Sequence, residues 1–139
     1  MPFNDPDQRV IVKWTVALEA QDQPLIGKVA VAYVIKNRAL AWKKTLAEVC
    51  FQKWQFFCWT PENGLAGEIT ALQNTPVGVM KECGHAVDIA MEGIWPDPTH
   101  GATNYLNIEL TKQQNNGKLP DWALTMQHVA KIGEHDFYK

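Results

Sequence analysis

Hydrophobic residues recur with helical spacing from the start of the chain. Residues 8–20 place apolar side chains on one face of a predicted helix, namely Val10, Trp14, Ala17 and Leu18. This helix must end before Pro24, because a proline disfavours helical geometry in the residue that precedes it. The pattern predicts that the chain turns between residues 21 and 23 and then starts a new helix.

The second helix has the most regular apolar stripe of the sequence. Its apolar positions follow the i, i+3, i+4, i+7 rule: Ile26, Val29, Ala30, Tyr33, Val34 and Leu40. Pro24 is predicted as its first residue, with Asp22 or Gln23 as the cap. Lys28 and Lys36 fall on the polar face of this helix. Asn37 lies at the edge of the stripe, so we expect its amide to bond a buried group.

The rest of the chain alternates shorter helices with loops. Thr45 and Glu48 have the spacing of a capping box for a short helix. Further predictions are a loop over 51–65, helices over 65–73 and 77–92, an ordered loop over 95–104, a short strand within 104–110, a mobile polar segment over 111–118, and a tail with one helical turn whose last aromatic residues pack back. The predicted fold class is mainly α, in the α+β sense, as one domain over residues 1–139 with a small β element.

Composition excludes several functions. Charged residues make up 20% of the chain and the formal net charge is −2, with no basic stripe of the kind that nucleic-acid binders carry. No polybasic or apolar segment predicts a membrane anchor, and the polar N-terminus lacks the apolar core of a signal peptide. Cys50, Cys58 and Cys83 fit no zinc or redox spacing and are expected to be buried thiols. We expect a monomer without cofactor or metal.

Glu19 is the first candidate for chemistry. It lies at the predicted C-terminal end of an apolar helix, where the helix dipole disfavours a carboxylate. The neighbouring Trp14 and Leu18 suggest partial desolvation, which also raises the pKa of a carboxyl group. A carboxylic acid that keeps its proton near neutral pH can protonate the leaving oxygen of a glycosidic bond.

Four motifs in this order resemble one protein family. They are EAQDQPLIGKVAVAYVIKNR at 19–38, QFFCW at 55–59, DPTHGATNY at 97–105, and PDW at 120–122 followed by IGEHDFY at 132–138. Together they resemble the signature of the SleB/CwlJ-type cell-wall hydrolases, and they span almost the whole chain. The departures are Leu18, Gln21, Asp22, Gln23 and Phe57, where the family has Gly, Arg, Gly, Glu and Ser.

The resemblance implies a lysozyme-like, transglycosylase-related fold in which Glu19 is the catalytic residue. The implied substrate is the peptidoglycan glycan strand, cleaved between N-acetylmuramic acid and N-acetylglucosamine. Glu19 would act first as an acid and then as a base. As a base it would activate water in hydrolysis, or the muramoyl 6-hydroxyl in lytic transglycosylation. Ordinary glycosidases use a second carboxylate, which substrate-assisted enzymes replace with the sugar's own N-acetyl group. Asp22 is the nearby acid that could serve as a second carboxylate, or it could cap a helix.

Four further residues are candidates for substrate binding. Gln55, Thr103 and Tyr105 are polar residues of the motifs that could hold the sugar or the Glu19 carboxyl group. Trp59 is the candidate for stacking on a sugar ring.

Three other functions stay open from the sequence. A metal-dependent peptidoglycan amidase or peptidase would need metal ligands at a recognisable spacing such as HExxH, which the four histidines do not form. His135 is instead expected to make a structural hydrogen bond. A nucleophile built from Cys58 and a histidine lacks a nearby cation to lower the cysteine pKa. A non-catalytic virion or binding module could retain the fold without the reaction.

The expected setting is a phage endolysin. A compact catalytic domain of this kind would accumulate in the host bacterial cytoplasm and reach the periplasm through another protein, or it would be carried in the virion. The sequence names neither the host nor the outcome of the reaction, hydrolysis or transglycosylation.

Overall fold

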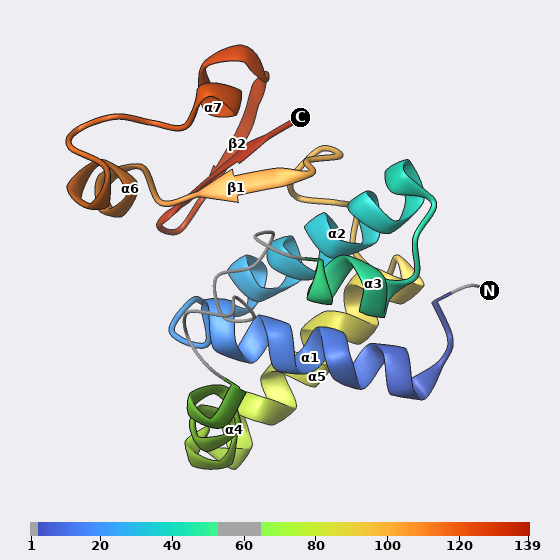
Figure 1. The fold of residues 1–139 in the computed structure, drawn as a ribbon. Coiled ribbons are helices and arrows are strands. Elements are labelled where there is room, and N and C mark those ends of the chain that lie inside the picture. Colours follow the sequence, from blue (N-terminus) through green and yellow to red (C-terminus); the bar gives the residue numbers. More distant parts are fainter. Residues whose placement is uncertain (1–2, 53–64) are drawn as a thin grey trace.

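The structure is a computed structural model, and it describes residues 3–52 and 65–139. Helices and a small sheet form two layers of unequal size (Figure 1). The elements are α1 (Pro6–Ala20), α2 (Leu25–Trp42), α3 (Leu46–Phe51), α4 (Leu65–Asn74), α5 (Val77–Glu92), β1 (Asn104–Leu106), α6 (Ile108–Gln114), α7 (Asp121–Thr125), β2 (His128–Ile132) and β3 (His135–Tyr138).

The helices α1, α2, α3 and α5 form the main hydrophobic core. α2 is the central element, because it packs against α1, α3 and α5 and also contacts β2. Its middle is buried on every side, with Val29, Val31 and Ile35 at 0% exposure. A helix that is apolar all round belongs inside a protein, so α2 sets the position of the others.

The polar residues of α2 depart in part from the sequence prediction. Lys28 was predicted on the solvent face but is only 3% exposed. Its ammonium group is 2.9 Å from a carboxylate oxygen of Glu82 and donates to the Gln23 carbonyl at 2.5 Å, which compensates for its burial. The prediction for Asn37 is confirmed, since its amide donates to the buried Ala102 carbonyl at 2.9 Å.

The sheet has the strand order β1-β3-β2, with both pairs antiparallel. The last strand of the chain is therefore central, and Phe137 lies opposite Tyr105 on one side and Ala130 on the other. Phe137 is fully buried and packs with Ala30 and Val34 of α2 in a second, smaller core. This contact attaches the sheet to the helical body (Figure 1).

Local sequence signals place most helix ends correctly. The capping box of α3 is confirmed, with the Thr45 hydroxyl accepting from the Glu48 N–H at 3.1 Å and the Glu48 carboxylate accepting from the Thr45 N–H at 3.0 Å. Pro24 is the N-cap of α2 rather than its first residue, and no side chain caps this helix. The predicted capping roles of Asp22 and Gln23 are therefore wrong.

The C-terminal third differs most from the prediction. The strand predicted within 104–110 ends at residue 106, and α6 occupies residues 108–114, where a strand end and a mobile segment were expected. The Asn107 side chain starts this helix by accepting from the Leu110 N–H at 3.0 Å. The tail contains the expected helical turn, α7, but also two strands that the sequence did not reveal.

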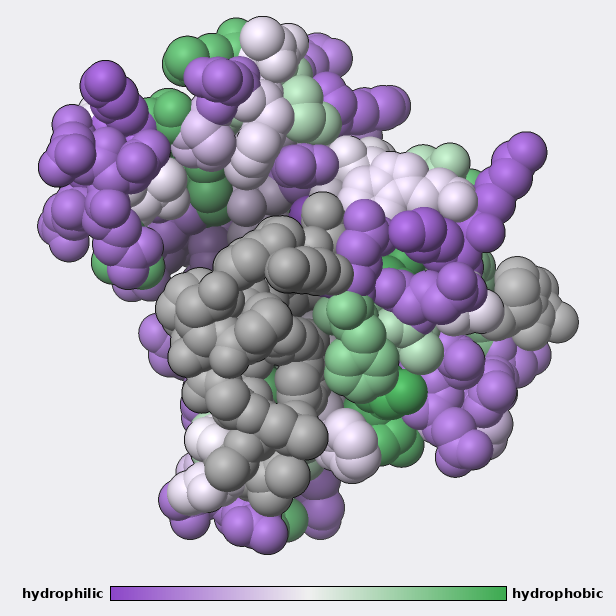
Figure 2. Space-filling model, in the orientation of Figure 1, coloured by the Kyte–Doolittle hydropathy of each residue, from purple (hydrophilic) through white to green (hydrophobic). Residues whose placement is uncertain are grey.

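Cys50 and Cys83 are buried free thiols, as predicted, and Cys58 lies outside the described residues. Trp14 was placed on the apolar stripe of α1 but is 39% exposed. In the described part of the chain, no helix has both the length and the apolar character needed to cross a bilayer. Hydrophilic residues cover most of the visible face of the lobe that contains α6 (Figure 2).

Candidate active site

Glu19 lies in the last turn of α1 and is partly buried. Its neighbours Ala17 and Ala20 are fully buried, and Leu18 packs against the main core. The chain then reverses tightly, with the Gln23 N–H bonded to the Ala20 carbonyl at 3.0 Å. Glu19 is thus fixed on a rigid helix end rather than on a loop.

Arg38 supplies a buried positive charge near Glu19. Its side chain extends from α2, is 4% exposed, and donates from Nε to the Thr103 carbonyl at 2.5 Å. The guanidinium lies over the Trp42 ring, 5.3 Å from the ring centre. Burial lowers the pKa of Arg38, while Tyr105, Cys50 and Glu19 act in the opposite direction. An arginine stays charged in spite of such a shift, so Arg38 is a fixed cation between α1 and β1.

The loop before β1 is held by a single carboxylate. Asp97 Oδ1 accepts from the Thr99 N–H at 2.8 Å and from its hydroxyl at 2.7 Å. Asp97 Oδ2 accepts from the Gly101 N–H and from the Asn37 amide, both at 2.9 Å. These bonds explain why a segment with two prolines is ordered, and they fix the loop that carries Thr103 into the site.

Tyr105 and His135 meet above the helical body. Their rings pack edge to face with centres 4.9 Å apart, on the neighbouring strands β1 and β3. Burial lowers the pKa of His135, against the opposing effect of Asp22, Glu134 and Asp136, so the imidazole is neutral at neutral pH. Its buried Nδ1 has no hydrogen-bond partner among the described residues. The structural hydrogen bond expected of His135 is therefore not found at this nitrogen.

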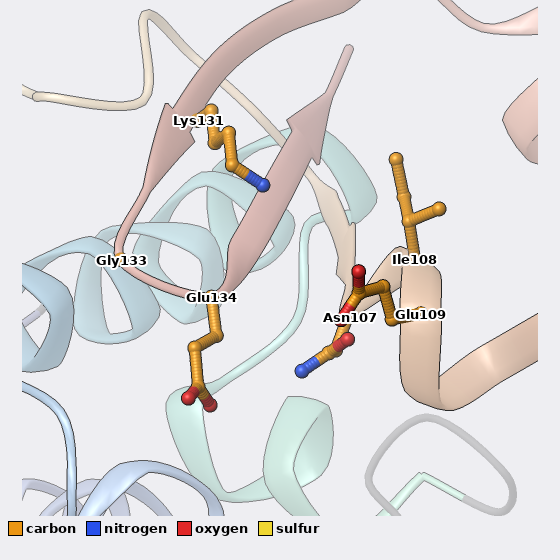
Figure 3. Close-up of a pocket in the computed structure, with 6 residues that line it drawn as sticks. All are labelled: Asn107, Ile108, Glu109, Lys131, Gly133 and Glu134. Carbon is orange, nitrogen blue, oxygen red and sulfur yellow. The ribbon is translucent and has the colours of Figure 1, made fainter.

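A pocket of about 380 Å³ opens beside this group. It is lined by the β2–β3 turn and the start of α6, through Asn107, Ile108, Glu109, Lys131, Gly133 and Glu134. Figure 3 shows the Asn107 amide nitrogen pointing across the pocket towards Glu134. Glu134 also contacts Gln23, four residues after Glu19, so the pocket adjoins the helix end that carries the candidate acid.

Three of the predicted site residues come together. Glu19 and Tyr105 both act electrostatically on Arg38, and the Thr103 carbonyl accepts its hydrogen bond. The Thr103 hydroxyl donates to the Asn104 side chain at 3.1 Å. Gln55 and Trp59 lie outside the described residues, so their predicted roles stay predictions.

The sequence did not assign a role to Arg38 and gave His135 only a structural one. The signal for Arg38 was an arginine in the second half of a largely apolar helix, where a buried charge requires a partner. The signal for His135 was its place in the closing motif. Asp22 is exposed and faces His135 as one of three negative charges around it.

The described residues contain no group of three or more histidine, cysteine or acidic side chains placed to hold a metal ion. Among the described residues, the carboxyl group of Glu19 is a group that could transfer a proton, and its charge acts on the buried Arg38. Partial burial excludes part of the water from this carboxyl group, which strengthens its interaction with Arg38. The cation favours the carboxylate form of Glu19, whereas burial favours the protonated form, so the two effects oppose each other.

Comparison with known proteins gives the site its context. The chain is similar to two solved structures, the catalytic domain of the germination-specific lytic transglycosylase SleB from Bacillus anthracis and the catalytic domain of the Bacillus cereus SleB protein. Both are 28% identical to it and cover 97% of it, with TM-scores of 0.70 and 0.69, over 96% and 91% of their own chains. Among curated protein sequences, none matches.

The fold likeness includes α1, so it extends to the helix that carries Glu19. A family profile, that of the Cell Wall Hydrolase family, matches residues 22–138. This match begins three residues after Glu19 and contains Arg38, Thr103, Tyr105 and His135. Because it spans most of the chain, the protein belongs to the Cell Wall Hydrolase family.

Proposed function

We propose that this protein cleaves the glycan strand of peptidoglycan by lytic transglycosylation, between N-acetylmuramic acid and N-acetylglucosamine. The observation that carries the proposal is the match of the fold to a lytic transglycosylase catalytic domain over 97% of the chain, with Glu19 at a rigid helix end where its charge acts on the buried Arg38.

The reaction needs one group that first gives and then takes a proton. Glu19 donates its proton to the glycosidic oxygen, and the bond from the muramoyl C1 to that oxygen breaks. The resulting carboxylate is stabilised by the charge of Arg38. It then accepts the proton of the muramoyl 6-hydroxyl while that oxygen bonds to C1, which leaves a 1,6-anhydro end and regenerates the acid.

The remaining residues would bind rather than react. Tyr105 and Thr103 lie on the sheet side of Arg38, where they can hold a sugar, and His135 presents a neutral imidazole beside Tyr105. Gln55 and Trp59 keep the sugar-binding and stacking roles proposed from the sequence. We further propose that the protein acts as a monomer.

Mass spectrometry of digested sacculi tests the reaction. Lytic transglycosylation predicts soluble fragments that end in anhydromuramic acid, each lighter by one water than the corresponding hydrolysis product. Reducing muramic ends would instead establish a muramidase. Free stem peptides, released only when chelator is absent, would establish a metal-dependent amidase.

The variant Glu19→Gln tests the residue. It keeps the shape of the side chain and removes the proton, so we expect the rate of fragment release to fall by about 100-fold or more. Glu92→Gln is the matched control, since Glu92 lies on α5 in an exposed pair with Arg9. A Glu19→Gln protein as lytic as the parent would mean that the fold is kept without this acid, as in a non-catalytic module.

The endolysin setting is a separate proposal. Its support is the membership of the chain in a family of cell-wall hydrolases. The loss of turbidity of a bacterial culture tests it. Expression in Gram-negative cells should lyse them only when a membrane-permeabilising protein is co-expressed. Lysis by the enzyme alone would contradict a cytoplasmic endolysin that depends on a partner.

A further inference from the structure

The side chain of Gln23 joins the two parts of the molecule that carry the site. Gln23 follows α1, is 6% exposed, and reaches the turn between β2 and β3. Its Nε2 donates to a carboxylate oxygen of Glu134 at 3.4 Å, and its Oε1 accepts from the Glu134 N–H at 3.5 Å. The amide thus bonds both the side chain and the backbone of one residue of that turn.

The backbone of Gln23 is itself fixed. Its N–H bonds the Ala20 carbonyl at 3.0 Å, and its carbonyl accepts from the buried ammonium group of Lys28 at 2.5 Å. Lys28 is in turn paired with Glu82 of α5. The backbone of Gln23 therefore has little freedom to follow the sheet if the sheet moves.

A glycine on the facing turn makes this close approach possible. A Cβ atom on Gly133 would lie 2.5 Å from Oε1 of Gln23, which is closer than any real contact. Gly133 also has a φ of +58°, a conformation that other residues rarely adopt. The turn is built to bring Glu134 and His135 against the end of α1.

Residue 23 is glutamine where the family signature has glutamate, and in this chain its side chain faces the carboxylate of Glu134. Asp22, Glu134 and Asp136 already place three negative charges around His135, and Glu109 and Lys131 line the pocket beside Glu134. A carboxylate at residue 23 would lie at hydrogen-bond distance from Glu134, and two like charges so close cannot both stay ionised without cost. The amide avoids this repulsion and donates to Glu134 instead.

We propose that Gln23 is a positioning residue for the cleavage reaction. It acts as a neutral bridge that holds the His135–Tyr105 side of the site at a fixed distance from Glu19. This inference rests on the proposed function, because the distance matters only if Glu19 and the sheet bind the same substrate. Gln23 touches neither the reacting atoms nor, in this proposal, the substrate.

The test is an exchange of the amide and the carboxylate. Gln23→Glu creates the repulsive pair, and the double variant Gln23→Glu with Glu134→Gln restores one donor and one acceptor at the same place. Glu134→Gln alone is the reference for the lost charge at residue 134. Gln113→Glu, on the exposed face of α6, is the control for adding a negative charge. The kcat and KM of each protein are measured on soluble glycan strands across pH, and thermal unfolding is recorded alongside.

We expect Gln23→Glu to lower kcat at neutral pH by about ten-fold with little change in KM, the effect of one repulsive contact of about 1.4 kcal/mol. The ratio of its kcat to that of the parent should rise as the pH falls, because the paired carboxylates then share a proton. The double variant should return to the rate of Glu134→Gln alone. A purely structural role would lower the unfolding temperature of Gln23→Glu and leave its kcat, measured well below that temperature, equal to that of the parent.

Two results would overturn the proposal. One is a Gln23→Glu protein with the kcat of the parent at every pH. The other is a double variant no faster than Gln23→Glu, which would mean that the two side chains do not act as a pair. A parent protein that cleaves no glycan at all overturns the proposed function, and the positioning role falls with it.

Discussion

Arg38 shows how a buried charge is stabilised at the scale of one residue. Arg38 is 4% exposed, yet its guanidinium donates to the Thr103 carbonyl and stacks on the Trp42 ring, and the negative charge of Glu19 stabilises its charged form. A charge removed from water this far would be costly without such partners. Because these contacts depend on a planar group with several donors, a lysine cannot reproduce them.

Arg38→Lys should therefore reduce both stability and activity. The charge is kept, but the bond to Thr103 and the stacking are lost, so we expect a free energy of unfolding lower by about 1–2 kcal/mol. We expect kcat to fall by about ten-fold as the cation leaves its fixed place beside Glu19. Denaturant unfolding and the release of soluble glycan measure the two effects.

Arg9→Lys is the matched control. The Arg9 Nε donates to the Phe3 carbonyl at 2.6 Å, and its guanidinium pairs with Asp88 and Glu92 on the far end of the helical body. It should lose stability and keep full kcat. Equal losses of kcat in both variants would show that the Arg38 effect is one of stability alone.

The sequence could single out Glu19 because four motifs resemble the family signature and its place at a helix end is a local signal, and its catalytic role stays a prediction. It could not give Arg38 its role, because the Thr103 carbonyl that Arg38 bonds lies 65 residues further along the chain. The same limit explains Lys28, placed by helical spacing on a solvent face but paired in the structure with Glu82, 54 residues away. Pairings between distant segments decide burial, and periodicity does not report them.

At the scale of elements, the β2–β3 turn controls how the sheet meets α1. Gly133→Ala would place a methyl group 2.5 Å from Oε1 of Gln23 in a backbone conformation that alanine disfavours. The turn must then move away from α1. We expect a loss of more than about 2 kcal/mol in the free energy of unfolding, together with a clear loss of kcat.

The variant Gly93→Ala separates the cost of backbone strain at a positive φ from the cost of a steric clash with Gln23. Gly93 ends α5 with a φ of +64°, close to that of Gly133, but among the described residues no atom lies within 4 Å of an added Cβ. It should cost about 1 kcal/mol and leave kcat unchanged. If the two alanine variants lost the same stability and the same activity, the contact between Gly133 and Gln23 would have no special importance.

The elements themselves were predicted unevenly. The long helices α1, α2 and α5 follow from periodicity and the α3 cap follows from two residues, because these signals are contained in the elements. The strands β2 and β3 have five and four residues, too few for an alternating pattern to stand out. The pairing of β3 with β1 depends on contacts some thirty residues apart, which no local pattern contains.

At the scale of the whole molecule, α2 belongs to both cores. Val31 and Ile35 contribute to the main core, and Ala30 and Val34 contribute to the core beneath the sheet. Loss of the helical body therefore removes the support of the sheet. The site lies between these two parts, so a change in stability of either part is a change in the geometry around Glu19.

His135 connects this stability to pH. Burial lowers its pKa in the folded protein below the value near 6.5 that it has in the unfolded chain. Below that pH the unfolded chain binds a proton that the folded protein does not, so the free energy of unfolding falls as the pH decreases from about 6.5 towards the folded pKa. Above about 6.5 both states are neutral and His135 adds no dependence on pH.

The variant His135→Gln should remove this part of the pH dependence. Denaturant unfolding of parent and variant between about pH 5 and pH 8 gives two curves whose difference isolates His135, because the carboxyl groups titrate in both. His85→Gln, at an exposed position on α5, controls for the loss of one imidazole and should follow the parent curve. Parent and His135→Gln curves that stayed parallel through this range would mean that His135 is as easily protonated in the folded protein as in the unfolded chain. The assignment of a neutral imidazole beside Tyr105 would then be wrong.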